Sequence, residues 1–211
     1  PPFPASEARA AIEDELGQPV DELFLSFDDE AVAAASIAQV HFAQTFDGRE
    51  VAVKILRPGV EAAFHRDVDL FRWLAELAER TQPQLRRLKP VASIETLADT
   101  VELEMDLRFE AAAAAELRDN FTGDPGFQVP DVDWQLTGKR VLVTERLVGG
   151  IPLDDRDAIV EAGLDPVDML TKAAAASFRQ VFRDGFFHAD THPGNMFAMP
   201  DGRIAVVDFG I

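Results

Sequence analysis

The C-terminal end of the chain carries the side chains with the clearest chemical potential. Asp190 is followed by Asn195 after a short loop, and Asp208 follows a segment that reads as a hairpin turning at Asp201-Gly202. A carboxylate on a tight loop can accept a hydroxyl proton, while an amide oxygen and a second carboxylate can hold Mg²⁺ against phosphate oxygens. The spacing therefore predicts phosphoryl-transfer chemistry, with Asp190 as the base and with Asn195 and Asp208 as metal ligands.

A lysine on an expected strand supplies a second part of such a site. Residues 50–56 alternate between apolar and other side chains, which places Lys54 on the face opposite the valines. A strand lysine beside a nucleotide cleft can reach the α- and β-phosphates, and a carboxylate from a neighbouring helix holds it in place. A long helix expected over residues 94–118 offers Glu102 and Glu104, and their helical angles do not distinguish between them.

The order of these parts is that of the protein-kinase catalytic loop and its Asp-Phe-Gly turn. Ordinary kinases cover the phosphates with a glycine-rich loop, because glycine lets backbone N–H groups approach closely. Here residues 33–41 read Ala-Ala-Ala-Ser-Ile-Ala-Gln-Val-His instead. Ala189 replaces the arginine that can bind an activation-loop phosphate, so we expect no switching through that residue. His188 is expected to pack and to form hydrogen bonds, and not to act as the base.

With this alanine-rich loop, the sequence resembles the UbiB-type atypical kinases, the aarF-domain family linked to ubiquinone biosynthesis. Further matches are Val-Ala-Val-Lys at 51–54, Glu-Met-Asp at 104–106 and Gly-Gly-Ile-Pro-Leu at 149–153. The resemblance covers nearly the whole chain. Ala38 stands where the family usually has glycine, and Thr191 stands where it commonly has proline.

The resemblance implies ATP or ADP and Mg²⁺ as cofactors, and it implies a set of site residues. Its Glu-x-Asp motif falls on Glu104 and Asp106, which selects Glu104 as the partner of Lys54. The expected catalytic residues are Asp190, Lys54 and Glu104, and the expected metal ligands are Asn195 and Asp208. The expected nucleotide-binding residues are Ala33, Ala34, Ala35, Ser36, Ile37, Ala38, Val40, Lys54, Glu145 and Leu147, the last two in a linker whose backbone binds adenine.

The elements that must position these residues read as an α+β arrangement. Strands are expected over residues 24–27, 39–46, 50–56, 128–134 and 140–147, and helices over 60–80 and 94–118. A later helix over 165–183 is apolar nearly all round and is expected to be buried. We predict a protein-kinase-like two-lobed fold. Residues 1–148 form an N-lobe with a five-stranded antiparallel sheet and extra helices, and residues 149–211 begin a helical C-lobe.

The composition limits the classes of partner and the cellular compartment that we expect for this chain. The 211 residues include 38 Asp and Glu against 20 Lys and Arg, and a net charge of −18 argues against nucleic acid as a partner. The absence of cysteine excludes thiol nucleophiles and disulfides, and it is typical of a reducing compartment. No apolar run is long enough to span a bilayer.

The chain reads as a soluble fragment, since the family's Lys-x-Gly-Gln segment and the C-terminal remainder are missing from it. The resemblance places the full-length bacterial protein at the cytoplasmic face of the membrane, held there only by segments outside this chain.

Two functions fit these observations. The first is an ATP-dependent atypical kinase or ATPase that supports ubiquinone or another quinone pathway, with a lipid-like quinone precursor or quinone-biosynthesis proteins as partners. The phosphoryl acceptor, the quinone and the oligomeric state stay open. The second is a non-catalytic, pseudokinase-like scaffold that senses ADP or ATP for a lipid-biosynthetic complex. The alanine-rich loop favours the second function, whereas the intact set Lys54, Asp190, Asn195 and Asp208 favours the first.

Overall fold

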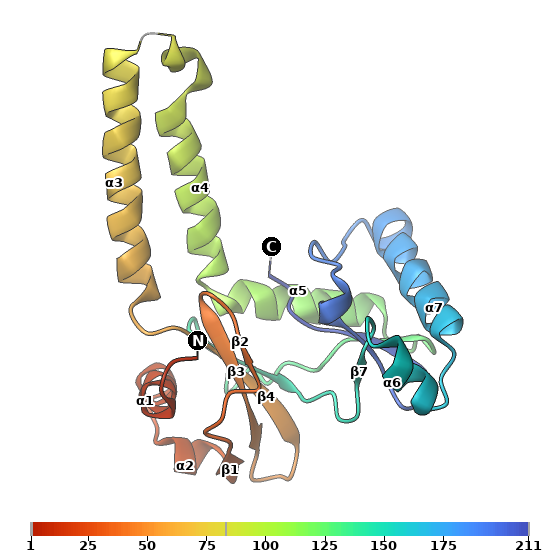
Figure 1. Cartoon of the computed structure of the whole chain (residues 1–211). Coiled ribbons are helices and arrows are strands. Elements are labelled where there is room, and N and C mark those ends of the chain that lie inside the picture. Colours follow the sequence, from red (N-terminus) through yellow and green to blue (C-terminus); the bar gives the residue numbers. More distant parts are fainter. Residues whose placement is uncertain (1, 83, 211) are drawn as a thin grey trace.

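The computed structural model describes residues 2–82 and 84–210, which form two β-sheets connected and covered by helices (Figure 1). The first sheet has five strands and is antiparallel throughout. Its strands are β1 (Ser26–Phe27), β2 (Ala33–Ala34), β3 (Ala38–Gln44), β4 (Glu50–Leu56) and β6 (Val141–Glu145), in the order β1-β3-β4-β6 with β2 also paired to β3. The predicted α+β fold with an antiparallel sheet is confirmed.

The side chains of strand β4 alternate between the two faces of the first sheet. Val51, Val53 and Ile55 are buried on one face, against α1 (Ala5–Leu16) and α2 (Val20–Leu23). The intervening Lys54 therefore faces the other side. Its ladder partners are Val40 on β3 and Leu142 on β6, so the lysine occupies the middle of the sheet.

The helix α5 (Leu107–Asn120) covers the face on which Lys54 lies. Its buried residues Leu107, Ala111, Ala114 and Leu117 recur at helical spacing and pack in one core cluster with Leu142 of the sheet. Small alanine side chains let the helix axis approach the strands closely. A carboxylate on this buried helix face is thereby brought to the strand lysine.

The helix predicted over residues 94–118 is two helices. α4 (Pro90–Glu104) ends before Met105, and α5 begins after Asp106, whose side chain accepts a hydrogen bond from the Arg108 N–H as an N-cap. The prediction of one continuous helix is wrong because the cap at Asp106 starts a new helix with a new buried face.

Helices α3 (Val60–Thr81) and α4 form a hairpin that projects away from the rest of the molecule (Figure 1). The short 3-10 helix η1 (Leu85–Leu88) lies at its far end. Only Val68 and Ala75 of α3 and Ala98 of α4 are fully buried among the described residues of the two helices. The hairpin is therefore held together by a narrow apolar seam.

The second sheet has the strand order β5-β9-β8-β7. Its strands are β5 (Phe127–Gln128), β7 (Ile151–Pro152), β8 (Met196–Ala198) and β9 (Ile204–Val206). A single strand over residues 128–134 was predicted in the first sheet. Instead, Phe127 and Gln128 pair with β9, and Val132 makes an isolated bridge to Thr144. The fifth strand of the first sheet is β2, which comes from the alanine-rich loop.

The C-terminal helices are α6 (Arg156–Glu161) and α7 (Pro166–Arg179), followed by a turn of π-helix, η2 (Gln180–Asp184), and a 3-10 turn, η3 (Pro193–Asn195). α7 buries Met169, Ala173 and Ala176, but Leu170 and Phe178 on its other side are exposed in this chain. The prediction that this helix is buried all round is therefore wrong for the structure described here.

Candidate active site

Lys54 lies between two carboxylates from distant parts of the chain. Its Nζ is 2.8 Å from Oε2 and 2.9 Å from Oε1 of Glu110 on α5, and 2.7 Å from Oδ1 of Asp208 beyond β9. The Lys54 and Glu110 side chains are 21% and 8% exposed, whereas Asp208 is 50% exposed. The three groups join the first sheet, α5 and the second sheet at one point.

The charges of this triad are set by burial and by each other. Burial opposes the charged form of Lys54, but the carboxylates of Glu110 and Asp208 outweigh it and raise the pKa of the ammonium group. Burial raises the pKa of the Glu110 carboxyl, although the Lys54 charge opposes that rise. The two carboxylates therefore favour the charged form of Lys54, and the Lys54 charge in turn favours the ionised form of Glu110 against the effect of burial.

The assignment of Glu104 as the partner of Lys54 is wrong in this structure. Glu104 is the last residue of α4 and is exposed to solvent. The helix break at Asp106 takes Glu104 off the helix that covers the lysine, and Glu110, at the start of α5, takes its place. A signal for this was present: Leu107, Glu110, Ala111 and the following small residues form a fresh helical stripe after an N-capping aspartate.

The loop that carries Asp190 is held by hydrogen bonds from both sides. The Asp190 side chain is exposed, and its Oδ2 accepts a hydrogen bond from Nδ2 of Asn195 at 3.1 Å. His188 is buried, with its Nδ1 accepting from the Asp190 N–H at 3.2 Å and its Nε2 at 3.1 Å from the Val207 carbonyl oxygen. Because Nδ1 accepts, the neutral ring carries its proton on Nε2 and donates it to Val207. His188 thus ties the loop of Asp190 to the strand that leads into Asp208.

The strand pair β8–β9 places Asn195 close to the residue before Asp208. Met196 pairs with Val206, and the Val207 N–H donates to the Asn195 carbonyl oxygen at 2.9 Å. Asp208 has a positive φ of 62°, a conformation that Asp tolerates better than most residues. Its carboxylate is thereby turned toward Lys54.

The donor set of this hairpin fits Mg²⁺. Asn195 and Asp208 offer an amide and a carboxylate oxygen, the hard ligands that Mg²⁺ prefers, and Mg²⁺ commonly uses one or two such protein groups together with phosphate oxygens and water. In the described part of the chain no group of three His, Asp or Glu side chains forms a self-sufficient metal site. The arrangement is therefore suited to a cation that arrives with a phosphate ligand.

The alanine-rich loop is a closed β-hairpin. Ala33 and Ala34 pair with Val40 and Gln39, and the Ala35 N–H donates to the Ala38 carbonyl oxygen at 2.8 Å. Ala33, Ala34, Ala35 and Ser36 are exposed, Ile37 and Val40 are half-buried, and Ala38 is buried. At least one N–H that a glycine-rich loop would offer to phosphate is used inside this hairpin.

Arg57 ties the tip of this loop to the end of β4. Its backbone N–H donates to the Ile37 carbonyl oxygen at 2.7 Å, and its Nε donates to the Ser36 carbonyl oxygen at 3.2 Å. Sequence reasoning did not identify this residue, since an arginine after a strand carries no recognisable signal by itself. The two contacts fix the loop relative to the strand that carries Lys54.

Strand β6 ends at Glu145, two residues before the predicted end of this strand at Leu147. The N–H groups of Glu145 and Arg146 donate to carbonyl oxygens of Asp131 and Glu50, and the Leu147 carbonyl oxygen accepts from the Gly150 N–H. Within residues 2–82 and 84–210, no hydrogen bond uses the Leu147 N–H as a donor. That group is available to a ligand.

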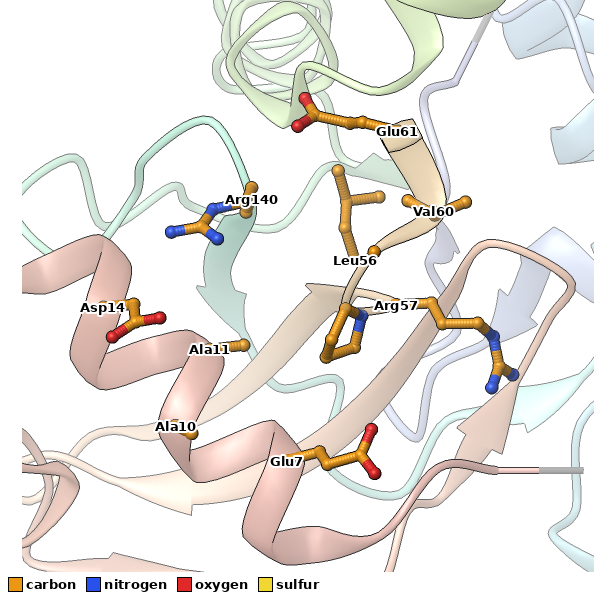
Figure 2. A pocket seen from close by; sticks show the side chains of 11 residues that line it. Glu7, Ala10, Ala11, Asp14, Leu56, Arg57, Val60, Glu61 and Arg140 are labelled. Carbon is orange, nitrogen blue, oxygen red and sulfur yellow. The ribbon is translucent and has the colours of Figure 1, made fainter. Parts of the chain in front are cut away.

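A separate hollow of about 200 Å³ lies beside α1 (Figure 2). Glu7 and Asp14 of α1, together with Arg140, Leu56 and Pro58, line this space. It lies between α1 and the end of β4, and its lining does not include Lys54, Glu110 or Asp208. It therefore does not belong to the site formed by Lys54, Glu110 and Asp208.

The site has the parts of a protein-kinase-like chain. These are a strand lysine with its helix carboxylate, the aspartate on the loop and the aspartate that follows the hairpin. All of residues 1–211 match the family model described as the ABC1 atypical kinase-like domain, and the chain belongs to that family. The resemblance to UbiB-type kinases is confirmed by curated relatives. The probable protein kinases UbiB of Marinobacter nauticus and Azotobacter vinelandii are 44% and 42% identical over all of this chain.

A solved structure supports the same fold. The complex of Rv3197 with erythromycin from Mycobacterium tuberculosis is 34% identical, with a TM-score of 0.81 over all of this chain and 52% of its own. The chain covers 39% of the M. nauticus relative and 40% of the A. vinelandii relative, so it spans about two fifths of their length. Among the helices of the described residues, none is both long and apolar enough to cross a bilayer.

Proposed function

We propose that this chain is the nucleotide-binding part of an ATP-dependent atypical kinase or ATPase. The observation that carries the proposal is the contact of Lys54 with both Glu110 and Asp208. Active kinase-like sites require a lysine paired with a helix carboxylate, and beside it the aspartate of Asp-Phe-Gly to hold Mg²⁺. The contacts of Lys54 bring these groups together. A surface lysine with a purely structural role has no need of a partner on the metal-binding turn.

Each residue of the site then has a distinct role. Lys54 binds the α- and β-phosphates while Glu110 keeps it in place, and the linker near Glu145 and Leu147 binds adenine through its backbone. Asn195 and Asp208 hold Mg²⁺, which neutralises charge on the phosphate oxygens when it is bound. Asp190 orients the acceptor hydroxyl or water and accepts its proton.

The test is phosphate release from ATP by the full-length protein. The wild-type protein is expected to release phosphate in the presence of Mg²⁺, and Asp190→Asn is expected to lose that activity while still binding nucleotide. Asp201→Asn, on the exposed turn of the same β8–β9 hairpin, is the matched control. Equal phosphate release by wild type and Asp190→Asn would contradict an enzymatic role for this site.

A second function has one specific observation in its favour. The alanine-rich loop forms a closed hairpin in which the Ala35 N–H is already bonded to Ala38. A loop that withholds a donor from the γ-phosphate suits a non-catalytic scaffold that senses ADP or ATP. Nucleotide binding without phosphate release, and without effect of Asp190→Asn on either, would favour this scaffold role.

The link to quinone metabolism is proposed from the relatives named UbiB. Under this proposal the full-length protein acts at the cytoplasmic face of a bacterial membrane, and the acceptor is a lipid-like quinone precursor, a biosynthetic protein or water. Labelled ATP, Mg²⁺ and a membrane lipid extract, incubated with the full-length protein, would identify the acceptor. Residues 1–148 and 149–211 remain our proposed division into N-lobe and start of C-lobe.

A further inference from the structure

The far end of the α3–α4 hairpin is a cationic apex on an acidic molecule. We define the apex as residues 80–82 and 84–94. This stretch contains Arg80, Arg86, Arg87 and Lys89 and no acidic residue, so all 38 Asp and Glu of the chain lie outside it. The local charge of this stretch is therefore opposite in sign to the net charge of the chain.

Three of the four cations of the apex form no ion pair in the described part of the chain. Arg80 pairs with Glu76, and Arg86 donates from Nε to the Glu79 carbonyl oxygen. In the described part of the chain, no ion pair includes Arg86, Arg87 or Lys89, although most other arginines and lysines have one. Residues 84–89 are all exposed. The positive charge is thus available to an external anion.

Exposed apolar side chains are interleaved with these cations. Leu85 and Leu88 of η1 are 38% and 66% exposed, in the order Leu-Arg-Arg-Leu-Lys over residues 85–89. Further down the hairpin, Trp73 on α3 is 58% exposed. A basic turn that also presents leucines has the composition of a segment that lies in the headgroup region of a membrane, where cations meet lipid phosphates and leucines enter the acyl boundary.

The net charge of the chain is −18, and the length of the hairpin would keep most of that negative charge away from an anionic surface. α3 has 22 residues, which corresponds to about 33 Å at ~1.5 Å per residue. Figure 1 shows the hairpin extending away from both sheets, with its closed end furthest from them. The Debye length at physiological ionic strength is ~8 Å, so repulsion between the acidic body and the surface is screened over most of that distance. The charges close to the surface would then be those of the apex and of the adjoining helix turns, which include Glu76, Glu79 and Glu95.

We infer that the apex docks on a bilayer surface that contains anionic lipid headgroups, which replaces the expectation that only segments outside this chain reach the membrane. Arg86, Arg87 and Lys89 contact the lipid phosphates, and Leu85 and Leu88 enter the interface. This surface is separate from the nucleotide site, so the inference goes beyond the proposed function and does not depend on it. Each cation near an anionic surface contributes ~1 kcal/mol, which is about a fivefold change in affinity.

The absence of cysteine from this chain allows a local test. Leu88→Cys in the full-length protein is labelled with a polarity-sensitive dye, with any cysteine outside these 211 residues replaced. The protein is then incubated with vesicles of phosphatidylcholine alone or with a quarter of phosphatidylglycerol. We expect a blue shift of the dye with phosphatidylglycerol vesicles that weakens as salt is raised. The same dye at Val148→Cys, an exposed position on the body, is expected to give no shift.

Charge variants decide whether the apex itself recognises the anionic surface. With Arg86→Glu/Arg87→Glu, the lipid concentration that gives half of the dye shift is expected to rise by more than tenfold. Arg87→Gln/Lys89→Gln, which keeps the Arg86 contact with Glu79, is expected to raise that concentration by about tenfold or more. The matched control Arg156→Glu/Arg203→Glu changes the net charge equally on the body and is expected to retain the shift.

Three outcomes would overturn the inference. The first is an equal shift with and without phosphatidylglycerol. The second is a shift that both apex variants leave unchanged. The third is a shift produced by an acidic polypeptide such as polyglutamate and not by the vesicles, which would assign the apex to an acidic protein partner.

Discussion

The Lys54 ammonium lies 2.7 Å from Oδ1 of Asp208, the carboxylate that the proposed function assigns to Mg²⁺. In this arrangement the Lys54 ammonium neutralises the Asp208 carboxylate. Under the proposed function, the same carboxylate has to bind Mg²⁺ when nucleotide binds. The half-exposed position of Asp208 leaves it room to do so, whereas Glu110 is almost fully buried and stays with the lysine. Under the proposed function, nucleotide binding would therefore exchange the Asp208 partner of Lys54 and keep Glu110.

The first prediction concerns Asp208. Asp208→Asn in the full-length protein removes a carboxylate ligand and leaves phosphate oxygens facing a neutral amide. We expect Mg²⁺-dependent ATP affinity to fall by at least about 10- to 100-fold. Calorimetric titration with and without Mg²⁺ measures this, and Asp201→Asn on the β8–β9 turn is the control. Wild-type MgATP affinity in Asp208→Asn would remove Asp208 from the site.

The second prediction distinguishes Glu110 from other carboxylates of its helix. Glu110→Gln keeps the shape of the side chain but no longer neutralises Lys54, which is then free to follow Asp208. We expect turnover to fall by about 10- to 100-fold, because a displaced lysine misplaces the phosphates. Glu116→Gln, on the exposed side of the same α5, is the control and is expected to retain turnover. The assignment fails if both variants have the same activity.

The contrast between Glu110 and Glu104 shows how far sequence reasoning reaches. The alternation around Lys54 and the hairpin before Asp208 follow from local patterns, and the structure has both. The partner of Lys54 could not be selected in the same way, because it depended on whether one helix or two cross residues 94–118. The N-cap at Asp106 starts a new helix, whose buried face is set independently of the preceding helix. Such a capping side chain stabilises a helix by only about 1 kcal/mol, so the break is difficult to predict from sequence.

Other differences arise from tertiary pairing. The segment after α5 has the composition of one strand, yet β5 pairs with β9 and Val132 bridges to Thr144. Strand propensity describes a pleated, half-buried environment and does not specify which sheet provides it. The hydrogen bonds of Arg57 to the alanine-rich loop likewise depend on where two separate segments meet.

The third prediction is a pH dependence of stability. Burial raises the pKa of Glu110 above its unfolded value of 4.5, so the folded protein binds the proton more tightly than the unfolded chain does. The stability that this carboxyl contributes is present below pH ~4.5 and is lost as pH rises through the raised folded pKa. Glu110→Gln has no titrating carboxyl group at this position. The free energy of unfolding of wild type, relative to that of the variant, should therefore decline as pH rises above ~4.5. Urea unfolding of both proteins from pH 4.5 to 8 measures it, and a constant difference would contradict the prediction.

The fourth prediction separates the base from the residue that positions it. Both ring nitrogens of the buried His188 are engaged with backbone groups, at Asp190 and Val207, so the ring has no free site for substrate chemistry. Asp190→Asn is expected to lower turnover by about 10²- to 10⁴-fold, and His188→Asn by a smaller factor through loosening of the loop. Phosphate-release assays at pH 7 compare the two. Loss of turnover in His188→Asn with activity retained in Asp190→Asn would reverse these roles.

The last prediction concerns the alanine-rich loop as a brake on ATP. The Ala35 N–H is bonded to Ala38 inside the hairpin, and Arg57 holds the carbonyl oxygens of Ser36 and Ile37. A phosphate cradle needs backbone N–H groups about 3 Å from phosphate oxygens, and alanine Cβ atoms restrict the positive φ values that would turn them there. The γ-phosphate extends furthest under such a loop, so the native loop should favour ADP relative to a glycine-containing loop.

Ala35→Gly should therefore raise the ATP-to-ADP affinity ratio. Ordering a glycine costs ~0.5–1 kcal/mol, and giving up the bond to Ala38 costs a similar amount. One charge-assisted hydrogen bond to phosphate contributes ~1.5–3 kcal/mol, so the net gain is small and about two- to fivefold in the ratio. Titration of both nucleotides into wild type, Ala35→Gly and the control Ala31→Gly, which precedes the hairpin, would measure it. An unchanged ratio in Ala35→Gly would mean that the alanines only pack the hairpin, and that discrimination between ATP and ADP comes from Lys54 and the metal-binding turn.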